Sequence, residues 1–513
     1  MRRRVIALFG LCQVPFGGRS VALAQGTPYT SSSPLRACCL GAASEQEISI
    51  RDTLPSLLSV SRNAASIPRS LSQSWRRVLG QARTTEGGWR RPQDAARINA
   101  LALTAEGEQR AGAWFVSGGV TYGRASDVGV SWRNTSDAYL GNSFIWADSV
   151  GGTFQRDELA LAGALVTPSW RGMNAGVQID YGLGQGARQN DPKPLFRRRV
   201  AELSPAVAYT FGRQQIGAGV MLGWQREDLE IGGGLSAEFP LVYRLRGLGT
   251  FDRTQLISAE RAMIGGVSGA HAGWSRTGDR WVTAIGTTLR VERDSVRDGI
   301  ATPVSGGATR RTRRDGEAAL RRRSASGGLE VAAALRMEEA RGVDPIFRAV
   351  NVIDAGTAME ARLRWWRGVD PVSARWGAGL VVSQSRLSRR DIAAETAWEA
   401  VMPSIAATAT HRVPAPGGDL LLGVGGGLGW RGSTAYSAQR PTQLTPILAL
   451  ADFGVVSAPT RRALLSLAWE RIVAGRVSSR VRVDGSLART SGRLADDRES
   501  LARSMWSLSL ELF

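Results

Sequence analysis

Hydrophobicity alternates with a period of two along most of this sequence, from about residue 111 to the last residue. In segment 329–337, for example, the odd positions include Val331 and Leu335, and the even positions include Glu330 and Arg336. Successive side chains of a strand point to opposite faces, whereas those of a helix repeat every 3.6 residues. The pattern therefore predicts an all-β chain whose strands each have one apolar and one polar face.

The length of these strands separates two all-β architectures. Strands of soluble sandwiches usually run for about five or six residues, whereas strands of about nine to eleven residues cross a bilayer when tilted. The predicted strands have the longer length, which indicates an antiparallel up-and-down transmembrane barrel of about 16 strands (range about 14–18). They begin at about residues 112, 145, 157, 172, 200, 215, 258, 280, 315, 327, 356, 372, 397, 418, 443, 461, 475 and 503.

Aromatic residues and glycines support a membrane barrel. Trp often ends the apolar face of a predicted strand, as Trp224 and Trp469 do, and the 16 Trp outnumber the 12 Phe and 7 Tyr. An indole ring suits the lipid headgroup zone, so these residues predict an interfacial girdle. The 61 Gly favour curved strands over helices. No apolar run of about 18 residues follows the N-terminus, which excludes a helical membrane protein.

The N-terminal region predicts export. Residues 1–24 combine three arginines, an apolar stretch and a small-residue ending, the pattern of a cleaved secretory signal peptide. Residues 25–110 are expected to form a short, partly ordered periplasmic segment, with a helix start near Asp52 and a second helix over Pro68–Gln81. Residues 111–513 are then the barrel, and the predicted location is the bacterial outer membrane.

The formal charge of +20 suggests nucleic acid at first sight, but its distribution argues against it. Lys193 is the single lysine, and the arginines are scattered through alternating segments instead of gathered in one patch. An exported chain also does not meet nucleic acid, so we exclude that class of partner. The expected partners are outer-membrane lipid and lipopolysaccharide, together with a periplasmic or outer-membrane protein.

Charged residues on the predicted strands lie on the polar face, which in a barrel lines the lumen. One interpretation is a structural set of ion pairs, which the interleaving of acids and bases favours; the other is a channel for anions. The candidate lumen charges are Arg290, Glu292, Glu330, Arg336, Glu360, Arg362, Arg364, Arg375, Arg480, Arg482 and Asp484.

Long connections are expected at about 183–198, 229–256 and 295–314. The densest basic segment overlaps the last of these and is predicted to be a basic loop that binds lipopolysaccharide phosphates if it faces outward, or an acidic periplasmic partner if it faces inward. The simplest interpretation is a solvated loop. Its residues are Arg310, Arg311, Arg313, Arg314, Arg321, Arg322 and Arg323.

Residue types that carry chemistry are sparse. The two histidines, His271 and His411, lie near no Gly-x-Ser-x-Gly nucleophile motif, so a lipid hydrolase is a minor alternative and girdle or strand-end histidines are expected. The glycine-rich segment 423–429 indicates a bend in a curved strand and not a phosphate loop. Three cysteines and two isolated histidines make no zinc site. We predict no catalytic, metal or cofactor site.

The C-terminal segment 504–513 alternates and ends in Phe513, and here the chain resembles bacterial outer-membrane β-barrel proteins. Its apolar residues lie on the opposite parity to Phe513, which predicts a bulge before that residue. Segments 190–194 and 243–247 resemble parts of an uncharacterised outer-membrane barrel family, a domain of unknown function. That resemblance implies the fold and supplies no activity.

These observations favour a porin-like channel or uptake barrel for small solutes, with anions suggested by the arginines. Two alternatives stay open. One is a non-transporting outer-membrane subunit of a secretion or uptake assembly, and the other is an outer-membrane lipid-modifying enzyme.

Overall fold

The computed structural model describes residues 65, 74–139, 142–190, 192–232, 242–253, 260–299, 301–368, 374–473, 476–490 and 501–513. The predicted signal peptide and the helix start near Asp52 lie outside these ranges. Within them, no helix is both long and apolar enough to cross a membrane.

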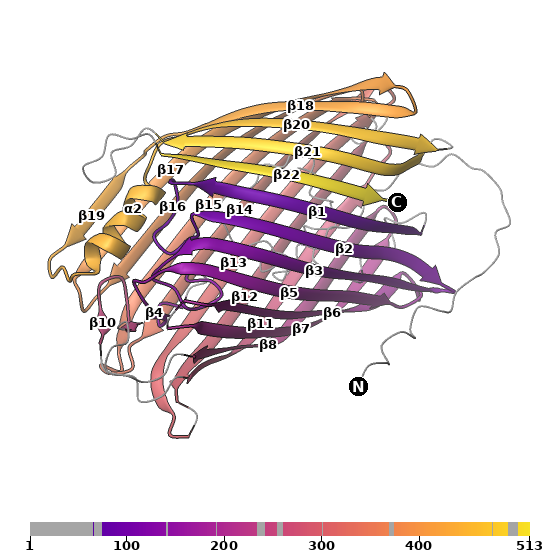
Figure 1. Ribbon diagram of the computed structural model, residues 1–513. Helices are drawn as coiled ribbons and strands as arrows, with labels where there is room; N and C mark the ends of the chain where they lie inside the picture. The colour runs from indigo at the N-terminus through magenta and orange to yellow at the C-terminus, as the bar shows by residue number, and fades with distance from the viewer. Residues whose placement is uncertain are drawn as a thin grey trace, which may run out of the picture.

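Eighteen of the strands in the described ranges form one closed antiparallel wall (Figure 1). Neighbours along the chain are neighbours in the wall, and β1 (Trp75–Gly87) pairs with β22 (Ala502–Leu512), so the barrel has no free edge. The other wall strands are β2 (Arg97–Ala111), β3 (Trp114–Val130), β5 (Gly152–Val166), β6 (Met173–Arg188), β7 (Pro194–Phe211), β8 (Gln214–Ile231), β11 (Glu260–Thr277), β12 (Trp281–Asp298), β13 (Val304–Ser324), β14 (Gly327–Val343), β15 (Val350–Arg367), β16 (Trp376–Asp391), β17 (Thr396–Ala415), β18 (Gly418–Gly429), β20 (Thr460–Val473) and β21 (Arg476–Thr490).

The two ends of the barrel differ in their connections. At one end β2, β7, β13 and β17 turn into the next strand within a few residues, and the C-terminus lies at this end. At the other end the chain makes three long connections, 131–151, 232–259 and 430–459. Outer-membrane barrels have short periplasmic turns and longer extracellular loops. We therefore assign the short-turn end to the periplasm and the other end to the cell exterior.

The outer surface is built for lipid. On β12 the outward positions from Trp281 to Val291 carry no charge, and β7, β8, β14 and β20 repeat this pattern. Exposed aromatic side chains form a girdle around the periplasmic end. Trp224 lies towards the opposite border of the uncharged band. The rings at the periplasmic end belong to Trp114, Trp170, Tyr209, Phe211, Trp281, Trp365 and Trp376. A closed wall with this exterior is an outer-membrane β-barrel, as the alternation predicted.

The barrel begins earlier than predicted. β1 and β2 belong to the wall, so the predicted start of the barrel at residue 111 is wrong. The predicted helix over Pro68–Gln81 is also wrong from Trp75 onward, where β1 begins. Both strands carry small or polar residues at many outward positions, such as Gly80, Thr84 and Asn99, which weakens the period-two signal. The predicted strand near 145 is only a short piece above the wall, and that near 443 is helical.

Two of the expected connections are instead strands. Residues 183–198 and 295–314 belong mostly to β6, β7, β12 and β13, so the predicted basic loop forms strand β13. These hairpins extend beyond the uncharged band, where both faces are polar and alternation of hydrophobicity no longer marks a strand, although the backbone ladder continues.

The C-terminal strand contains no bulge. Its pairing with β21 runs without a shift from Leu512 to Ala502, so the predicted bulge is wrong. Trp506, Leu508, Leu510 and Leu512 face outward, and β22 ends one residue before Phe513. The change of parity follows because Phe513 lies past the strand, near Arg480 of the inner wall.

Candidate functional site: the charged lumen and its closed mouth

The inner faces of β13, β14 and β15 carry a dense set of charges, which we call the lumen ladder. Arg311 lies between two carboxylates: its Nε donates to Oε1 of Glu338 at 2.7 Å, and its Nη1 lies 3.6 Å from Oε2 of Glu292 on β12. Glu360 and Arg362 pair along β15. The ladder consists of Arg311, Arg313, Asp315, Glu317, Arg321, Glu330, Arg336, Glu338, Glu360, Arg362 and Arg364.

Two carboxylates of the ladder each lie between two arginines. Asp315 accepts from Nε of Arg313 at 2.8 Å and from Nε of Arg336 at 2.9 Å. Glu330 accepts from Arg321 and lies opposite Arg364 in the register of β14 and β15. Among the described residues Nη1 of Arg364 is buried without a hydrogen-bond partner. At Glu330 two arginines thus share one carboxylate, whereas at Asp315 a second carboxylate, Glu317, follows on the same inner face of β13.

Most of the predicted lumen charges face inward, and most are in ion pairs. Arg290 pairs with Glu292 and with Glu202 of β7. Arg482 pairs with Asp484, and Arg480 lies between Glu470 and Glu511. Arg375 is the exception, because it precedes β16 in a connection and is exposed. The period of two thus placed the charged residues within strands on the inner face. It did not apply to Arg375, which lies before its strand begins.

The predicted basic segment is divided between the two faces of β13. Arg311, Arg313 and Arg321 point into the lumen, where each meets a carboxylate. Arg310 and Arg314 are exposed on the outer face. A run of arginines on one strand therefore serves two surfaces, since neighbouring side chains of a strand point in opposite directions.

The extracellular mouth contains a folded lid made by the three long connections, whose described residues are 131–139, 142–151, 242–253 and 430–459. They form the small sheet of β4 (Trp146–Ala147), β9 (Tyr243–Leu245) and β10 (Phe251–Asp252), then β19 (Thr434–Ala438), the π-helix η2 (Pro446–Leu450) and the helix α2 (Ala451–Val456). Figure 1 shows these elements gathered at the end away from the C-terminus.

The lid has its own apolar core, and it is seated in the mouth. Ile145, Leu245 and Leu448 pack together from its three segments. Trp146, 1% exposed, packs among inner-wall residues that include Phe154 and Phe196. Burial of this apolar area favours the closed position of the lid.

Phe144 of the lid occupies a seat made by glycines of the wall. Gly307 of β13 has a φ of +115° and no room for a side chain, since a Cβ atom there would lie 2.5 Å from the Phe144 ring. Gly342 of β14 meets the same ring. Glycine is needed at these two positions for the lid to close.

A cluster of charges, which we call the latch, joins the lid to the wall. Asp452 of α2 accepts two bonds from Arg91 of the β1–β2 connection, at 2.6 and 2.8 Å, and one from Arg389 of β16 at 3.3 Å. Arg389 also makes a two-bond pair with Asp354 of β15. The Arg91 guanidinium lies 3.5 Å from the ring centre of Tyr139. A gap of only about 20 Å³ remains beside the latch, roughly the space of one water.

Electrostatics hold the latch carboxylate ionised. Burial by itself would raise the pKa of Asp452, but the guanidinium groups of Arg91 and Arg389 outweigh it and lower that pKa below its usual value. Burial, reinforced by the charge of Asp452, raises the pKa of Tyr139 well above its ordinary value. At neutral pH the latch is therefore an ionised carboxylate between two cations with a neutral phenol beside it.

The pH dependence of the lid follows from the lowered pKa of Asp452. A carboxyl whose pKa falls on folding stabilises the closed lid above its unfolded value of about 3.9, and this contribution is lost as pH falls through the lowered value. We expect the lid to stay closed from neutral pH to about pH 4 and to loosen only below that. Hydrogen exchange of residues 446–456 across this range measures it, and loosening already between pH 7 and 5 would contradict it.

The two histidines occupy structural positions. The ring of His411 stacks on Trp376 with centroids 3.7 Å apart, on the lipid-facing side near the periplasmic end. His271 is buried on the inner wall opposite Thr288 and Gly219, so no serine lies directly across from it. Within the described ranges, no three His, Cys, Asp or Glu side chains come together as metal ligands.

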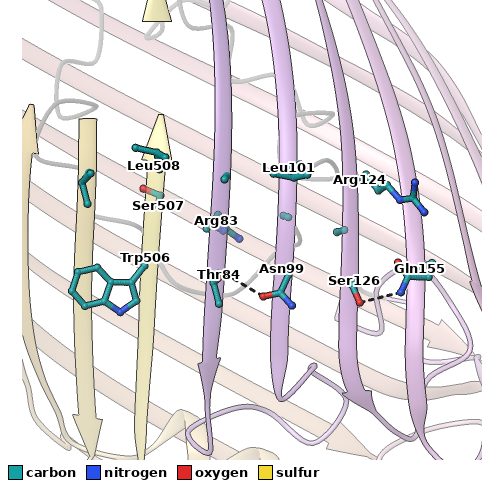
Figure 2. A pocket seen from close by; sticks show the side chains of 14 residues that line it. Arg83, Thr84, Asn99, Leu101, Arg124, Ser126, Gln155, Trp506, Ser507 and Leu508 are labelled. Atoms are coloured by element: carbon teal, nitrogen blue, oxygen red, sulfur yellow. Dashed lines mark hydrogen bonds between the residues drawn. The ribbon is translucent and has the colours of Figure 1, made fainter. Parts of the chain in front are cut away.

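A hollow of about 600 Å³ lies on the wall around β22, β1 and β2. Figure 2 shows Leu101, Leu508 and Trp506 beside two polar contacts, Thr84 with Asn99 and Ser126 with Gln155. Its exposed apolar side chains belong to the lipid-facing surface. The hollow is thus a feature of the outer face and gives no solute site in the lumen.

Sequence patterns did not identify the lid or its latch. Arg91 and Asp452 lie 361 positions apart, and each stands in a connection without periodicity. The length of the segment between β18 and β20 was the available signal, because a long connection at membrane depth must be either outside the barrel or folded into it.

The model of a family of unknown function, DUF6850, matches residues 67–513, from before β1 to the last residue. No curated protein matches the chain in sequence. Among solved structures it is similar to the ferric yersiniabactin uptake receptor of Yersinia pestis, at 8% identity and a TM-score of 0.38, covering 85% of this chain and 80% of the receptor. It is also similar to the outer-membrane protein OpdK of Pseudomonas aeruginosa, at 11% identity and a TM-score of 0.36, covering 86% and 99%. Similarity at this level says nothing about what passes through the barrel.

Proposed function

We propose that the barrel takes up small solutes, anions in particular, through a lumen closed from outside by the lid. The chain belongs to the DUF6850 family of unknown function. The observation that carries this proposal is the lumen ladder, where Glu330 accepts from Arg321 and lies opposite Arg364, whose Nη1 is buried without a hydrogen-bond partner among the described residues. An anion that reaches this place finds a guanidinium already turned into the lumen.

The ladder also allows release. A channel conducts when its sites attract an ion enough for entry and hold it weakly enough for exit. Each ladder arginine lies near a protein carboxylate, and that carboxylate competes with a bound anion. An anion therefore exchanges with the protein's own acids along the wall, from the lid towards the periplasm.

Removing two lumen arginines should abolish the preference for anions. We expect a barrel with an open lid to prefer chloride over potassium by about threefold, and the double variant Arg336→Gln, Arg364→Gln to show a ratio near one. The measurement is the reversal potential in planar bilayers under a salt gradient. The Asp452→Asn background is used because it removes the charge of the latch.

The matched control is Arg390→Gln with Arg461→Gln, which removes the same charge from outward positions. This control should keep the anion preference. An unchanged ratio in the lumen variant would contradict the anion proposal. If hydrogen exchange shows that the lid of the Asp452→Asn variant is open and this variant still carries no current, the result would instead support a non-transporting subunit.

A further inference from the structure

Arginines on the outer face of the barrel lie directly opposite one another across neighbouring strands. Arg293 of β12 is paired in register with Arg310 of β13, and Arg310 is paired with Arg341 of β14. All three side chains are exposed, and they form one row across three strands. Like charges at opposed positions destabilise a sheet, so the wall by itself gains nothing from this row.

The arrangement recurs elsewhere on the wall. Arg199 of β7 faces Arg226 of β8, and Arg461 of β20 faces Arg489 of β21, with all four side chains on the outer face. Within the described ranges no carboxylate pairs with Arg293, Arg310, Arg199, Arg461 or Arg489. Arg341 and Arg226 pair with acids of their own strands. We call these seven residues the arginine collar.

The row of Arg293, Arg310 and Arg341 lies near the upper border of the apolar band of β12. Arg293 lies 12 residues beyond Trp281 of the periplasmic girdle. With a rise of about 3.3 Å per residue and a tilt of about 40°, this places Arg293 about 30 Å above the girdle. The apolar band of such barrels is about 25 Å tall. The guanidinium groups therefore reach the headgroup layer of the outer leaflet.

Arginines at the periplasmic end are arranged differently. Arg322 of β13 lies opposite Trp281 and Leu329, and its guanidinium lies 5.7 Å from the Trp281 ring. Arg276 of β11 lies opposite Thr283 and Gln214. These outer-face residues do not oppose one another, so the like-charge rows mark one leaflet.

We propose that the arginine collar binds the phosphate groups of lipid A, the lipid part of lipopolysaccharide, and that the row Arg293, Arg310 and Arg341 is its strongest site. Guanidinium groups bind phosphate with two parallel hydrogen bonds, and a phosphate between two opposed arginines turns their repulsion into attraction. The acyl chains of the same molecule then lie on the mainly apolar outer face below, beside Leu289 and Val291 of β12, with Arg314 of β13 opposite Leu289. This proposal does not depend on transport.

The test uses the full barrel in detergent micelles and bisphosphorylated lipid A as the probe. Each arginine at a lipid surface contributes roughly a fivefold gain in binding, so the triple variant Arg293→Gln, Arg310→Gln, Arg341→Gln should bind about a hundredfold more weakly. Native mass spectrometry counts the lipid molecules retained. The matched control, Arg110→Gln, Arg276→Gln, Arg322→Gln, removes three exposed arginines at the periplasmic end and should bind as the wild type does.

Thermal unfolding gives a second measurement that does not depend on yield. Without lipid A the triple variant should melt at the wild-type temperature or above it, because a repulsive row has been removed. Added lipid A should raise the melting temperature of the wild type and the control, and leave that of the variant unchanged.

Two further probes separate the sources of binding. Inorganic phosphate should compete weakly, and equal competition by it would assign the row to free anions and overturn the lipid proposal. Dephosphorylated lipid A should lose the difference between wild type and variant. Equal retention of bisphosphorylated lipid A by variant and wild type would also overturn the proposal.

Discussion

Asp452→Asn should open the extracellular mouth. The substitution removes the carboxylate that Arg91 and Arg389 share and leaves two buried guanidinium groups facing each other without it. Losing one partner of a buried ion pair costs about 3–5 kcal/mol, which changes the ratio of open to closed lid by roughly a hundredfold or more. Single-channel recording in planar bilayers should show rare, brief openings for the wild type and sustained current for the variant.

Asp279→Asn is the matched control for this experiment. Asp279 also pairs with an arginine, Arg213, but both side chains are exposed at the periplasmic end. An exposed pair contributes little, so the current should stay at the wild-type level. Equal currents in Asp452→Asn and the wild type would show that the latch does not hold the mouth closed.

Asp148→Asn should unfold the lid segment that contains β4. Asp148 and Arg188 form a pair at 2.8 Å in which both side chains are fully buried. The neutral amide leaves the Arg188 guanidinium without its counter-charge, at a cost of about 3–5 kcal/mol. Amide hydrogen exchange in residues 142–151 should become at least a hundredfold faster, while exchange in the mid-barrel amides of β12 stays unchanged.

A paired replacement distinguishes the missing charge from general damage. Asp148→Leu together with Arg188→Met replaces both charges by apolar groups, which is often neutral for a buried pair. We expect this double variant to recover most of the protection in residues 142–151. If it exchanges as fast as Asp148→Asn, the pair is not what holds the segment in place.

The barrel itself could be predicted where strands lie in lipid. On β14 the alternation of Val331 and Leu335 with Glu330 and Arg336 identified the strand and its two faces, since lipid and the lumen impose opposite polarities. The predicted length of about nine to eleven residues was too short, because β14 runs over 17 residues and extends beyond the lipid. The same logic failed for β1, whose outward side chains are small, and for the upper part of β13, where water lies on both sides. In both places the backbone hydrogen bonds continue, but the side chains no longer alternate between apolar and polar, so the sequence does not reveal the strand.

The candidate sites could be predicted only in part. That Arg336 and Arg364 point into the lumen follows from the alternation of side chains along each strand, which is a local property. Which carboxylates these two arginines meet depends on which strands are neighbours and in which register. The opposed row of Arg293, Arg310 and Arg341 depends on register too, because a shift of one residue on β13 would place Arg311 outside instead.

By itself the sequence determined that this protein is an all-β membrane barrel. Lipid on one face of a strand and water on the other produce an alternation of apolar and polar residues that repeats every two positions. Only the tertiary structure decided that a folded lid is seated in the extracellular mouth. The lid depends on contacts between Arg91, Asp452 and Arg389 and on the seat of Phe144 over Gly307, which join segments far apart in the chain. Such contacts leave no periodic pattern, since each is made once and only after the wall has brought the segments together.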